Sequence, residues 1–486
     1  MIQIKVNHEM FAYDMYHITK AFCPKETIVQ EVDVTGRDAV SILYNQEHFA
    51  VREQELADIT GRKMKKRYVN KKLYAWLSAT TGKELAWGIL TGVRPTKLIM
   101  GLLEEGMSEG ETVAWMKEHY CVTERKANLG LQIAKKEKEL LSALDYRDGF
   151  SLYIGIPFCP TTCSYCSFPS YPICKWKERV EEYLDAVCRE LTVIGDIAKQ
   201  KEKKLNTVYV GGGTPTTLEP EQLDRLLSHL EAHFSYEDLL EITVEAGRPD
   251  SITKEKLEVL KAHNIGRISI NPQTMQQKTL DAVGRDHTVE DVKRVFCMAR
   301  ELGFDHINMD LIAGLPGETV EDMRDTLEQI QALAPDSLTV HALAMKRASR
   351  LMRESKEQEN REEDMETAKT LSRMIELAAD CAREMDLHPY YLYRQKNIAG
   401  NFENVGYAKV DKAGIYNILI IEEKQSIIAV GAGASTKIVL SDEQATMDPK
   451  TGNQKKIVRT ENVKDVEQYI NRIDEMIERK GELLWH

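Results

Sequence analysis

The middle of the chain alternates short apolar runs with longer stretches in which apolar residues recur at helical spacing. The runs are rich in β-branched and aromatic residues and read LYIGIPF, TVYVGGG, EITVEA, RISINPQ, HINMDLIAG and SLTVHALAM. Helical patterns lie between them, for example over 178–199, 220–233 and 289–302. Strands alternating with helices predict parallel βα units and hence an α/β fold. Six units are fewer than the eight of a closed barrel, so we expect a partial (β/α)6 barrel.

The segments on either side of these units have different patterns. The first part opens with short alternating segments that predict a small sheet, and it continues as charged helices. The last part contains a charged segment, an amphipathic helix, two β-rich runs (IYNILII and SIIAVGAG) and a final charged helix. We therefore expect an N-terminal α+β domain over 1–145, the partial barrel over 146–345 and a C-terminal α+β domain over 346–486.

Composition and charge narrow the class of function. The chain has 486 residues, 65 of them basic and 77 acidic, and a formal net charge of −12. Nucleic-acid binding needs a basic face, so this balance argues against nucleic acid as the main partner. The basic, aromatic stretch at residues 62–76 has two interpretations, contact with RNA or another anionic ligand and a charged helix face, and the second is favoured.

The start of the chain and its uncharged stretches indicate a cytoplasmic protein without a membrane span. Ile2, Ile4 and Val6 alternate like a strand, and no apolar segment with a cleavage site follows them. The longest uncharged run, residues 149–174, contains four prolines and three clustered cysteines, a composition that excludes a membrane-spanning helix. Nine cysteines in a chain of 486 residues do not make a disulfide scaffold.

The clustered cysteines carry the strongest chemical signal. Cys159, Cys163 and Cys166 have C-x3-C-x2-C spacing in a loop that follows the first predicted strand. Three thiolates on one short loop can bind three irons of a 4Fe-4S cluster and leave the fourth iron open. Zinc would need a fourth ligand, and Cys174, beyond two prolines, is a poor candidate, so zinc or unrelated buried cysteines are the weaker alternatives. An open iron is where S-adenosyl-L-methionine (SAM) chelates through its amino and carboxylate groups.

Glycine-rich or polar positions recur where the later strands end. They are Gly211 to Pro215 (GGGTP) after the second strand, Glu245 on the third, Asn271 and Gln273 after the fourth, Asp310 on the fifth and Ala344 near the end of the sixth. Glycines let a backbone approach a ligand closely. The carboxyl ends of parallel strands form the mouth of the active site in barrels of this kind. We therefore expect the cysteine loop and these positions to share one site.

Several of these motifs together resemble a known family. YIGIPFCPTTCSYCSF, YVGGGTPTTL, VEAGRPD, ISINPQT, VGRDHT and INMDLIAGLPGET resemble the oxygen-independent coproporphyrinogen III oxidase family of radical SAM enzymes. WGILTGVRPTKL, HPYYLYRQKN and VGAGAST resemble its HemZ branch. The resemblance implies that a 5′-deoxyadenosyl radical takes a hydrogen atom from each of two propionates of coproporphyrinogen III. Loss of CO2 and of one electron would then give each vinyl group of protoporphyrinogen IX. It also implies an electron donor of flavodoxin or ferredoxin type.

The resemblance also implies roles for individual residues. The cluster ligands would be Cys159, Cys163 and Cys166. The contacts of the cluster-bound SAM would be Tyr153, Gly212 and Glu245. The residues lining a second SAM or substrate position would be Tyr165, Gly213, Thr214 and Gln273. The sugar and methionyl part of SAM would be bound by Arg285 and Asp310, and the adenine region would be contacted by Ala344.

Three positions depart from the pattern of the decarboxylating branch. Phe168 stands where that branch has a fourth cysteine, and Gly155 where it has histidine. The usual proline-containing turn after the glutamate reads Glu245-Ala246-Gly247-Arg248. Phe at the first position also occurs in haem-chaperone relatives. The alternatives are therefore a haem-binding transfer protein that keeps cluster and SAM, with His341 and Met345 as conceivable haem ligands, and radical SAM chemistry on another substrate.

The YYLYR segment has two interpretations. Arg394, with Tyr390, Tyr391 and Tyr393, would face the propionates and pyrroles of a porphyrinogen, or the segment forms an aromatic packing patch.

Overall fold

The computed structural model describes the whole chain except residues 25, 143, 147, 344–361, 395–401, 442, 448–453 and 486. Its N-terminal part is a four-stranded sheet of order β2-β1-β3-β4. The strands are β1 (Ile2–Val6), β2 (Ile28–Val32), β3 (Asp38–Tyr44) and β4 (Glu47–Arg52). The helices α1 (Glu9–Phe22) and α2 (Arg62–Thr81) pack on it. The buried face of β1 carries Ile2, Ile4 and Val6, as their alternation predicts.

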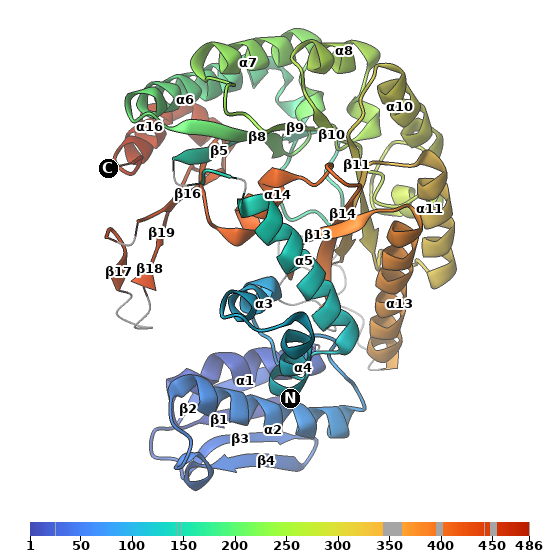
Figure 1. Ribbon diagram of the computed structural model, residues 1–486. Coiled ribbons are helices and arrows are strands. Elements are labelled where there is room, and N and C mark those ends of the chain that lie inside the picture. The colour runs from blue at the N-terminus through green and yellow to red at the C-terminus, as the bar shows by residue number, and fades with distance from the viewer. Residues whose placement is uncertain are drawn as a thin grey trace.

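Three further helices lead from this sheet to the rest of the molecule (Figure 1). They are α3 (Pro95–Glu104), α4 (Glu109–Tyr120) and α5 (Glu124–Ser142). Their apolar side chains, with Trp87, belong to the large core around the central sheet, whereas the first sheet has its own core. Trp87 Nε1 donates a hydrogen bond to Oε2 of the buried Glu403 at 2.7 Å, and Lys126 pairs with the same carboxylate.

The central part contains the six predicted parallel strands, which confirms the sequence pattern. They are β5 (Gly149–Ile156), β8 (Lys204–Gly212), β9 (Glu241–Glu245), β10 (Arg267–Ser269), β11 (Ile307–Ala313) and β12 (Ser337–Ala342). They pair in chain order and all in parallel, as βα units do. The adjacent ladders join Ile154 to Val210 and Val210 to Val244, so the carboxyl ends meet at one edge.

Helices cover the outer side of this sheet (Figure 1). They are α6 (Val180–Gln200), α7 (Pro220–His233), α8 (Lys254–Ala262), α10 (Val289–Glu301) and α11 (Val320–Leu333). The short helix α9 (Gln277–Ala282) follows β10. The helices α10 and α11 begin with capping boxes, in which Thr288 and Asp291, and likewise Thr319 and Asp322, satisfy each other's backbone amides.

The C-terminal strands extend the same sheet at both edges, to the order β13-β14-β12-β11-β10-β9-β8-β5-β15-β16-β19 within the described residues. The added strands are β13 (His388–Arg394), β14 (Glu403–Ala408), β15 (Ser426–Val430), β16 (Ser435–Val439) and β19 (Ile457–Glu461). β15 pairs in parallel with β5, which places the C-terminal segment beside the first barrel strand.

The other C-terminal elements are mainly helices. They are α13 (Glu362–Glu384), α14 (Ile415–Glu422), α15 (Val466–Asn471) and α16 (Ile473–Gly481), with the short strands β17 (Thr446–Met447) and β18 (Gln454–Lys455). The prediction of a β-rich run for IYNILII was wrong, because this segment is the helix α14. It lies on the inner side of the sheet, where the ring of Tyr416 stacks on Tyr209 of β8 at 4.5 Å between centroids.

Arg394 has a packing role, as in the second of the two interpretations of the YYLYR segment. Its side chain is buried, and its Nη1 donates hydrogen bonds to the carbonyl oxygens of Leu90 at 2.9 Å and Gly92 at 3.3 Å. Its guanidinium lies over the ring of Trp87. The residue therefore binds the N-terminal segment to β13.

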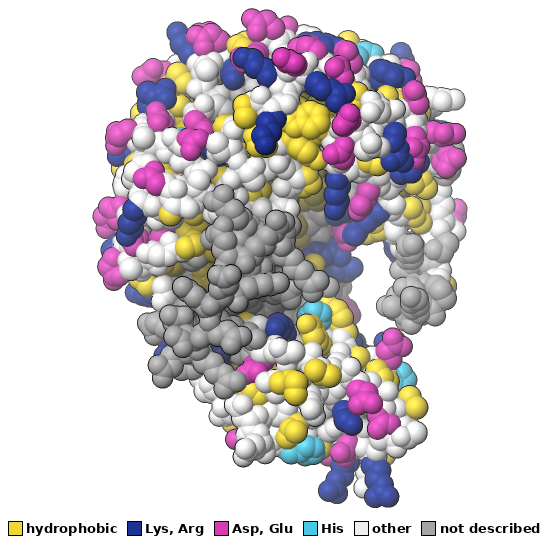
Figure 2. Space-filling view, turned by 180° about the vertical axis from the view of Figure 1, so that it is seen from behind, with side chains coloured by type: hydrophobic (Ala, Val, Ile, Leu, Met, Phe, Trp, Pro, Cys, Tyr) yellow, Lys and Arg dark blue, Asp and Glu magenta, His cyan; other side chains and the backbone are white. Residues whose placement is uncertain are grey.

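The charge distribution on the surface and the hydropathy of the helices can be compared with the expectation of no membrane span. On the face shown in Figure 2, acidic and basic side chains are interspersed over the outer helices. In the part of the chain that the structure describes, no helix is long and apolar enough to cross a membrane.

Candidate functional site

The cysteine loop follows β5 and is pinned at several points. The short strands β6 (Phe158–Cys159) and β7 (Tyr171–Pro172) pair with each other. The amide of Ser164 donates to the carbonyl of Val283 at 3.0 Å, and the hydroxyl of Thr161 donates to that of Gly284 at 3.0 Å. The loop is thus held against the segment that follows α9, with the three cysteine side chains half-buried.

The glycine turn after β8 lies directly under this loop. The amides of Gly213 and Thr214 donate to the carbonyls of Ile156 and Phe158 at 2.8 and 2.7 Å. A Cβ at Gly213 would stand 2.6 Å from the carbonyl oxygen of Phe158 and 3.0 Å from Sγ of Cys159. Only glycine permits this approach of backbone to loop. Thr214 Oγ1 also donates to Sγ of Cys159 at 3.4 Å.

The three thiols fit an iron–sulfur cluster better than a single ion. Burial, with a smaller contribution from the neighbouring thiols, raises the pKa of Cys159 to about 11, against the opposing hydrogen bond from Thr214. Among the described residues, no three His, Cys, Asp or Glu side chains are arranged to hold one metal ion. A cube binds each cysteine at a different iron, so its ligands need not converge on a point. Metal binding would supply the free energy that removes the thiol protons.

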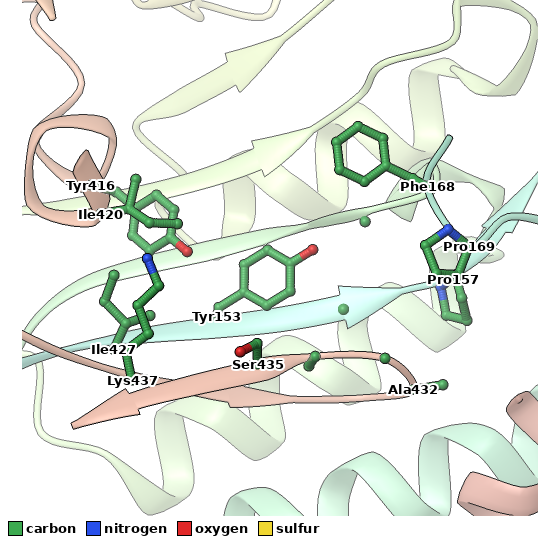
Figure 3. A pocket seen from close by; sticks show the side chains of 14 residues that line it. Tyr153, Pro157, Phe168, Pro169, Tyr416, Ile420, Ile427, Ala432, Ser435 and Lys437 are labelled. Carbon is green, nitrogen blue, oxygen red and sulfur yellow. The ribbon is translucent and has the colours of Figure 1, made fainter. Parts of the chain in front are cut away.

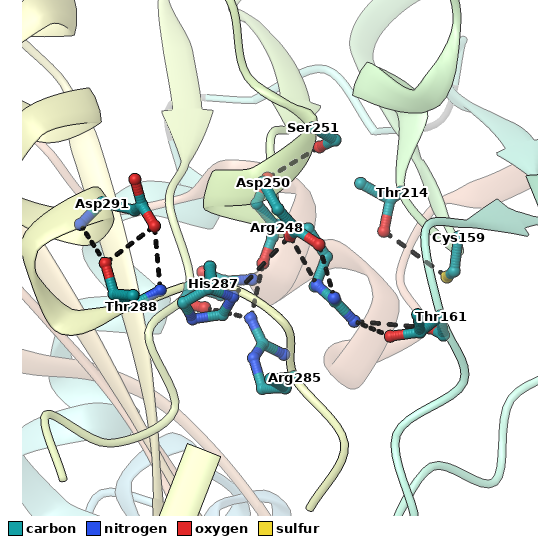
Figure 4. A network of polar contacts seen from close by, with 12 residues as sticks. Cys159, Thr161, Thr214, Arg248, Asp250, Ser251, Arg285, His287, Thr288 and Asp291 are labelled. Atoms are coloured by element: carbon teal, nitrogen blue, oxygen red, sulfur yellow. Dashed lines mark hydrogen bonds and ion pairs between the residues drawn. The ribbon is translucent and has the colours of Figure 1, made fainter. Parts of the chain in front are cut away.

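Arg285 joins the cysteine loop to the ends of two strands (Figure 4). This buried side chain donates from Nη2 to the carbonyl oxygens of Gly247 at 3.1 Å and Asn271 at 2.6 Å. Its Nη1 donates to the hydroxyl of Tyr165 at 3.2 Å and lies 3.9 Å from Sγ of Cys163. The guanidinium is therefore part of the cluster surroundings.

Glu245 ends β9 beside the glycine turn. The hydroxyl of Tyr209 donates to its carboxylate. Burial, with the negative charge of Asp310, raises the pKa of Glu245 to about 7, although the hydrogen bond from Tyr209 opposes this shift. A carboxyl group with this pKa changes charge near neutral pH, as groups at functional sites often do.

Asp310 on β11 has the opposite environment. Asn308 Nδ2 donates to its Oδ1 at 2.7 Å, and His341 Nε2 lies 3.7 Å from its Oδ2. Burial raises the pKa of Asp310, but His341 and Asn308 outweigh it and hold that pKa below its usual value. The site thus contains one carboxyl that titrates near neutral pH and one that stays ionised.

Gln273 completes this edge of the sheet. Its backbone has φ +69° and bridges β11, with its amide donating to the carbonyl of Asp310 and its carbonyl accepting from Ile312, both at 2.9 Å. Its side-chain Oε1 is buried without a hydrogen-bond partner among the described residues. A buried unsatisfied acceptor marks a position where a ligand donor can bind.

Most predicted site residues therefore lie together at the carboxyl ends of the parallel strands, beside the cysteine loop. Ala344 and Met345 lie outside the described residues. Cys174 is exposed, in the 3-10 turn Ile173–Lys175 beyond the cysteine loop. His341, the conceivable haem ligand, faces Asp310.

A cavity of about 320 Å³ opens beside the cysteine loop (Figure 3). Its lining comes from β5, the glycine turn, the cysteine loop, α14 and the β15–β16 hairpin, and includes Tyr153, Pro157, Phe168, Pro169, Gly212, Tyr416, Ile420, Ile427, Ser435 and Lys437. The walls are mainly apolar, and the ammonium of Lys437 extends toward Tyr416 and Ile420, away from Phe168. Sites for small molecules typically have such apolar walls with few polar groups.

Sequence reasoning missed Lys437 and Tyr416. Lys437 follows VGAGAST, a segment whose sequence indicates only the resemblance to the HemZ branch. Its place in the cavity depends on the pairing of Ile427 with Lys437 in the β15–β16 hairpin.

Comparisons with known proteins agree with this geometry. The family model of the radical SAM superfamily matches residues 153–330. The oxygen-independent coproporphyrinogen-III oxidase-like protein HemZ of Bacillus subtilis (strain 168) is 43% identical over 431 residues, which are 87% of this chain and 82% of that protein. The haem chaperone HemW of the same strain is 39% identical over 194 residues, 40% of this chain and 50% of HemW.

A solved structure has the same fold. Coproporphyrinogen III oxidase (HemN) from Escherichia coli, a radical SAM enzyme, superposes with a TM-score of 0.51 at 21% identity and covers 70% of this chain and 73% of its own. Proteins of this superfamily use a 4Fe-4S cluster and SAM, the cofactors expected from the cysteine loop. The chain belongs to the radical SAM superfamily and, within it, to the family of oxygen-independent coproporphyrinogen-III oxidase-like HemZ proteins.

Proposed function

We propose that the protein carries out the oxidative decarboxylation of coproporphyrinogen III propionates to give protoporphyrinogen IX in oxygen-independent haem biosynthesis. The observation that supports this most is the cavity, because its wall joins the cysteine loop to a cation. Pro157, Phe168 and Pro169 line one end and Lys437 the other. An anionic side chain bound at Lys437 would thus extend toward the cluster.

The roles of the site residues follow this proposal. Cys159, Cys163 and Cys166 would bind the cluster, and the residues around SAM would be Tyr153, Tyr165, Gly212, Gly213, Thr214, Glu245, Gln273, Arg285, Asp310 and Ala344. Cluster and SAM, once bound, supply a radical that abstracts hydrogen. The protein orients the propionate and keeps water out. The stacked rings of Tyr153, Tyr209 and Tyr416 support that enclosure.

The electrostatics at the Lys437 end favour an anion. The carboxylate of Glu423 contacts three cations, Lys437 at 3.5 Å, Arg94 at 2.9 Å and Arg459 at 3.0 Å. Burial, with the nearby Glu422, raises the pKa of Glu137 to about 9. Burial also raises the pKa of Glu422. Protonation of Glu137 and Glu422 therefore reduces the negative charge that these two residues contribute. The cations around Glu423 outnumber it, which suits a substrate carboxylate.

Lys437→Gln tests the substrate end of the cavity. We expect the KM for coproporphyrinogen III to rise by about 10-fold to 100-fold with kcat nearly unchanged, because a charge-assisted hydrogen bond of about 1.5–3 kcal/mol is lost from the ground state. Lys412→Gln is the matched control, since it breaks the 3.1 Å pair with Asp305 but does not line the cavity. If the two variants had equal effects on KM, or if Lys437→Gln had none, the proposal that Lys437 binds a substrate propionate would be wrong.

The reaction itself is tested by product analysis. Reconstituted protein is incubated anaerobically with SAM, a reductant and coproporphyrinogen III, and the masses of the porphyrins are determined by mass spectrometry. We expect a product lighter by two carboxyl groups, with SAM consumed and CO2 released. An intact substrate, under conditions in which the protein cleaves SAM, would contradict decarboxylation. A flavodoxin-like or ferredoxin-like protein is the proposed physiological electron donor.

A second candidate is a haem-transfer protein, favoured by one comparison. The chain is 39% identical over 194 residues to HemW from Bacillus subtilis and 32% identical over 190 residues to the oxygen-independent coproporphyrinogen III oxidase of Escherichia coli. Phe168, whose side chain is 67% exposed, stands where the decarboxylating branch has cysteine. A stable haem complex with a shifted Soret band, and no decarboxylated product, would establish this candidate instead.

A further inference from the structure

The turn after β9 contains an arginine, Arg248, directly before Pro249. Arg248 is only 3% exposed, directly precedes the 3-10 turn Pro249–Ser251, and points at the cysteine loop (Figure 4). Its Nη1 lies 3.6 Å from Sγ of Cys163 and donates to the hydroxyl of Thr161 at 3.1 Å. Nothing in the proposed reaction uses this guanidinium, so its burial needs another explanation.

Asp250 fixes the orientation of this side chain. Arg248 donates from Nε to Oδ1 of Asp250 at 2.9 Å and from Nη2 to Oδ2 at 2.6 Å. This two-point pairing holds the guanidinium plane and leaves Nη1 as the group that faces the loop. His287 Nδ1 lies 3.7 Å from the same carboxylate. The ion pair with Asp250 uses only Nε and Nη2 of Arg248. The position of Nη1 beside Sγ of Cys163 is therefore not needed for that pair.

We propose that Arg248 is a tuning residue for the cluster, which donates an N–H···S hydrogen bond to the sulfur of cluster-bound Cys163 and raises the reduction potential. The inference depends on the 4Fe-4S cluster of the superfamily and not on decarboxylation. Hydrogen bonds to cluster sulfurs are one of the means by which proteins set such potentials. Reduction from the 2+ to the 1+ state adds one electron, supplied in the test by dithionite, and a nearby buried cation stabilises that added negative charge.

Arg285 does not make Arg248 redundant. Arg285 lies 3.9 Å from the same sulfur, but the Nη1 that faces the sulfur also donates to the hydroxyl of Tyr165, and its Nη2 donates to two backbone carbonyls. Arg248 is closer to the sulfur, at 3.6 Å. Hydrogen bonds to an anionic sulfur strengthen as the donor approaches, so Arg248 should have the larger effect on the reduced cluster.

The test is a redox titration of the full-length, reconstituted Arg248→Gln protein, followed by the EPR signal of the reduced cluster. We expect the variant to keep about four irons and its midpoint potential to become more negative. The expected size is a reduced-to-oxidised ratio about tenfold lower at a fixed potential, which is about 59 mV for a one-electron couple.

Arg300→Gln is the matched control. Arg300 pairs with Asp336 at 2.6 Å, also as an arginine–aspartate pair, but at the amino end of β12, opposite the cluster loop. Its loss should leave the potential unchanged. An unchanged potential in Arg248→Gln, or an equal shift in both variants, would overturn the proposal.

A second measurement applies if Arg248→Gln does not retain a cluster. The protein is labelled with guanidino-15N arginine, reduced, and examined for 15N coupling to the cluster by pulsed EPR, with Arg248→Lys as the comparison. We expect coupling that weakens in Arg248→Lys, where only Arg285 remains near the sulfur. Absence of coupling in the unsubstituted protein, or equal coupling in both, would show that Arg248 only holds the loop. Because neither readout involves a porphyrin, failure here is distinguishable from failure of the decarboxylation proposal.

Discussion

Replacing Cys159, Cys163 and Cys166 together with alanine is expected to abolish the 4Fe-4S cluster. The three half-buried thiols lie on one loop and are the proposed sulfur ligands of the irons. After anaerobic reconstitution, the variant should contain almost no iron or sulfide and lack the brown absorbance, whereas the parent protein should contain about four of each per chain. Circular dichroism should be unchanged, because the loop contributes little regular structure.

Cys174→Ala is the matched control for the cysteine variants. Cys174 is exposed and lies beyond the loop, so its replacement should leave the iron content intact. If Cys174→Ala alone removed the cluster, or if the triple variant kept it, the ligand assignment would be wrong.

SAM binding is expected to weaken as the pH falls through about 7, and Glu245→Gln should remove this dependence. In the free protein, burial raises the pKa of Glu245 to about 7, so the carboxyl is mostly protonated at pH 6. The proposed contact, in which the iron-bound amino group of SAM donates an N–H to the Glu245 carboxylate, needs the ionised form, so binding below pH 7 must first release the carboxyl proton. The affinity should fall by up to about tenfold per pH unit below the pKa. Glu245→Gln should bind about 10-fold to 100-fold more weakly at pH 8, since a charge-assisted hydrogen bond is lost.

Equilibrium binding measured between pH 6 and pH 8 on the cluster-loaded protein checks this. Asp310→Asn should move the dependence to lower pH, because the Asp310 charge contributes to the raised pKa of Glu245. Glu241→Gln, at the start of the same strand, should leave both affinity and pH dependence unchanged. A pH profile that persists in Glu245→Gln would assign the titration to another group.

The parts of the fold that the sequence predicted are those specified locally. Each barrel strand is a short β-branched run bounded by glycine or by a loop, so local pattern sufficed for elements such as β11. The segment IYNILII is apolar on every side, and such a run does not distinguish a buried strand from a buried helix. Its helical form as α14 depends on tertiary packing, in which Tyr416, Ile418 and Leu419 are buried.

The cluster loop and the strand ends were predicted for a similar reason, because they follow each strand in order. Lys437 was not predicted, and for Arg394 the sequence left packing and substrate contact as alternatives. The position of Lys437 depends on a hairpin beside β5, and that of Arg394 depends on the carbonyl oxygens of Leu90 and Gly92. Such long-range pairings leave no periodic pattern in the sequence, and aromatic residues beside an arginine are equally suited to packing and to substrate contact.

The parallel pairing of β15 with β5 has a consequence for the order of assembly. Residue 150 of β5 pairs with residue 426 of β15. During synthesis, β5 therefore leaves the ribosome long before β15 has been made. Until then, β5 presents an unpaired edge, and the cavity beside the cysteine loop lacks the wall formed by α14, β15 and β16. Contacts of such sequence separation form late in folding. An oxygen-sensitive cluster inserted early would therefore be open to solvent, and iron–sulfur loading is expected to follow completion of the chain.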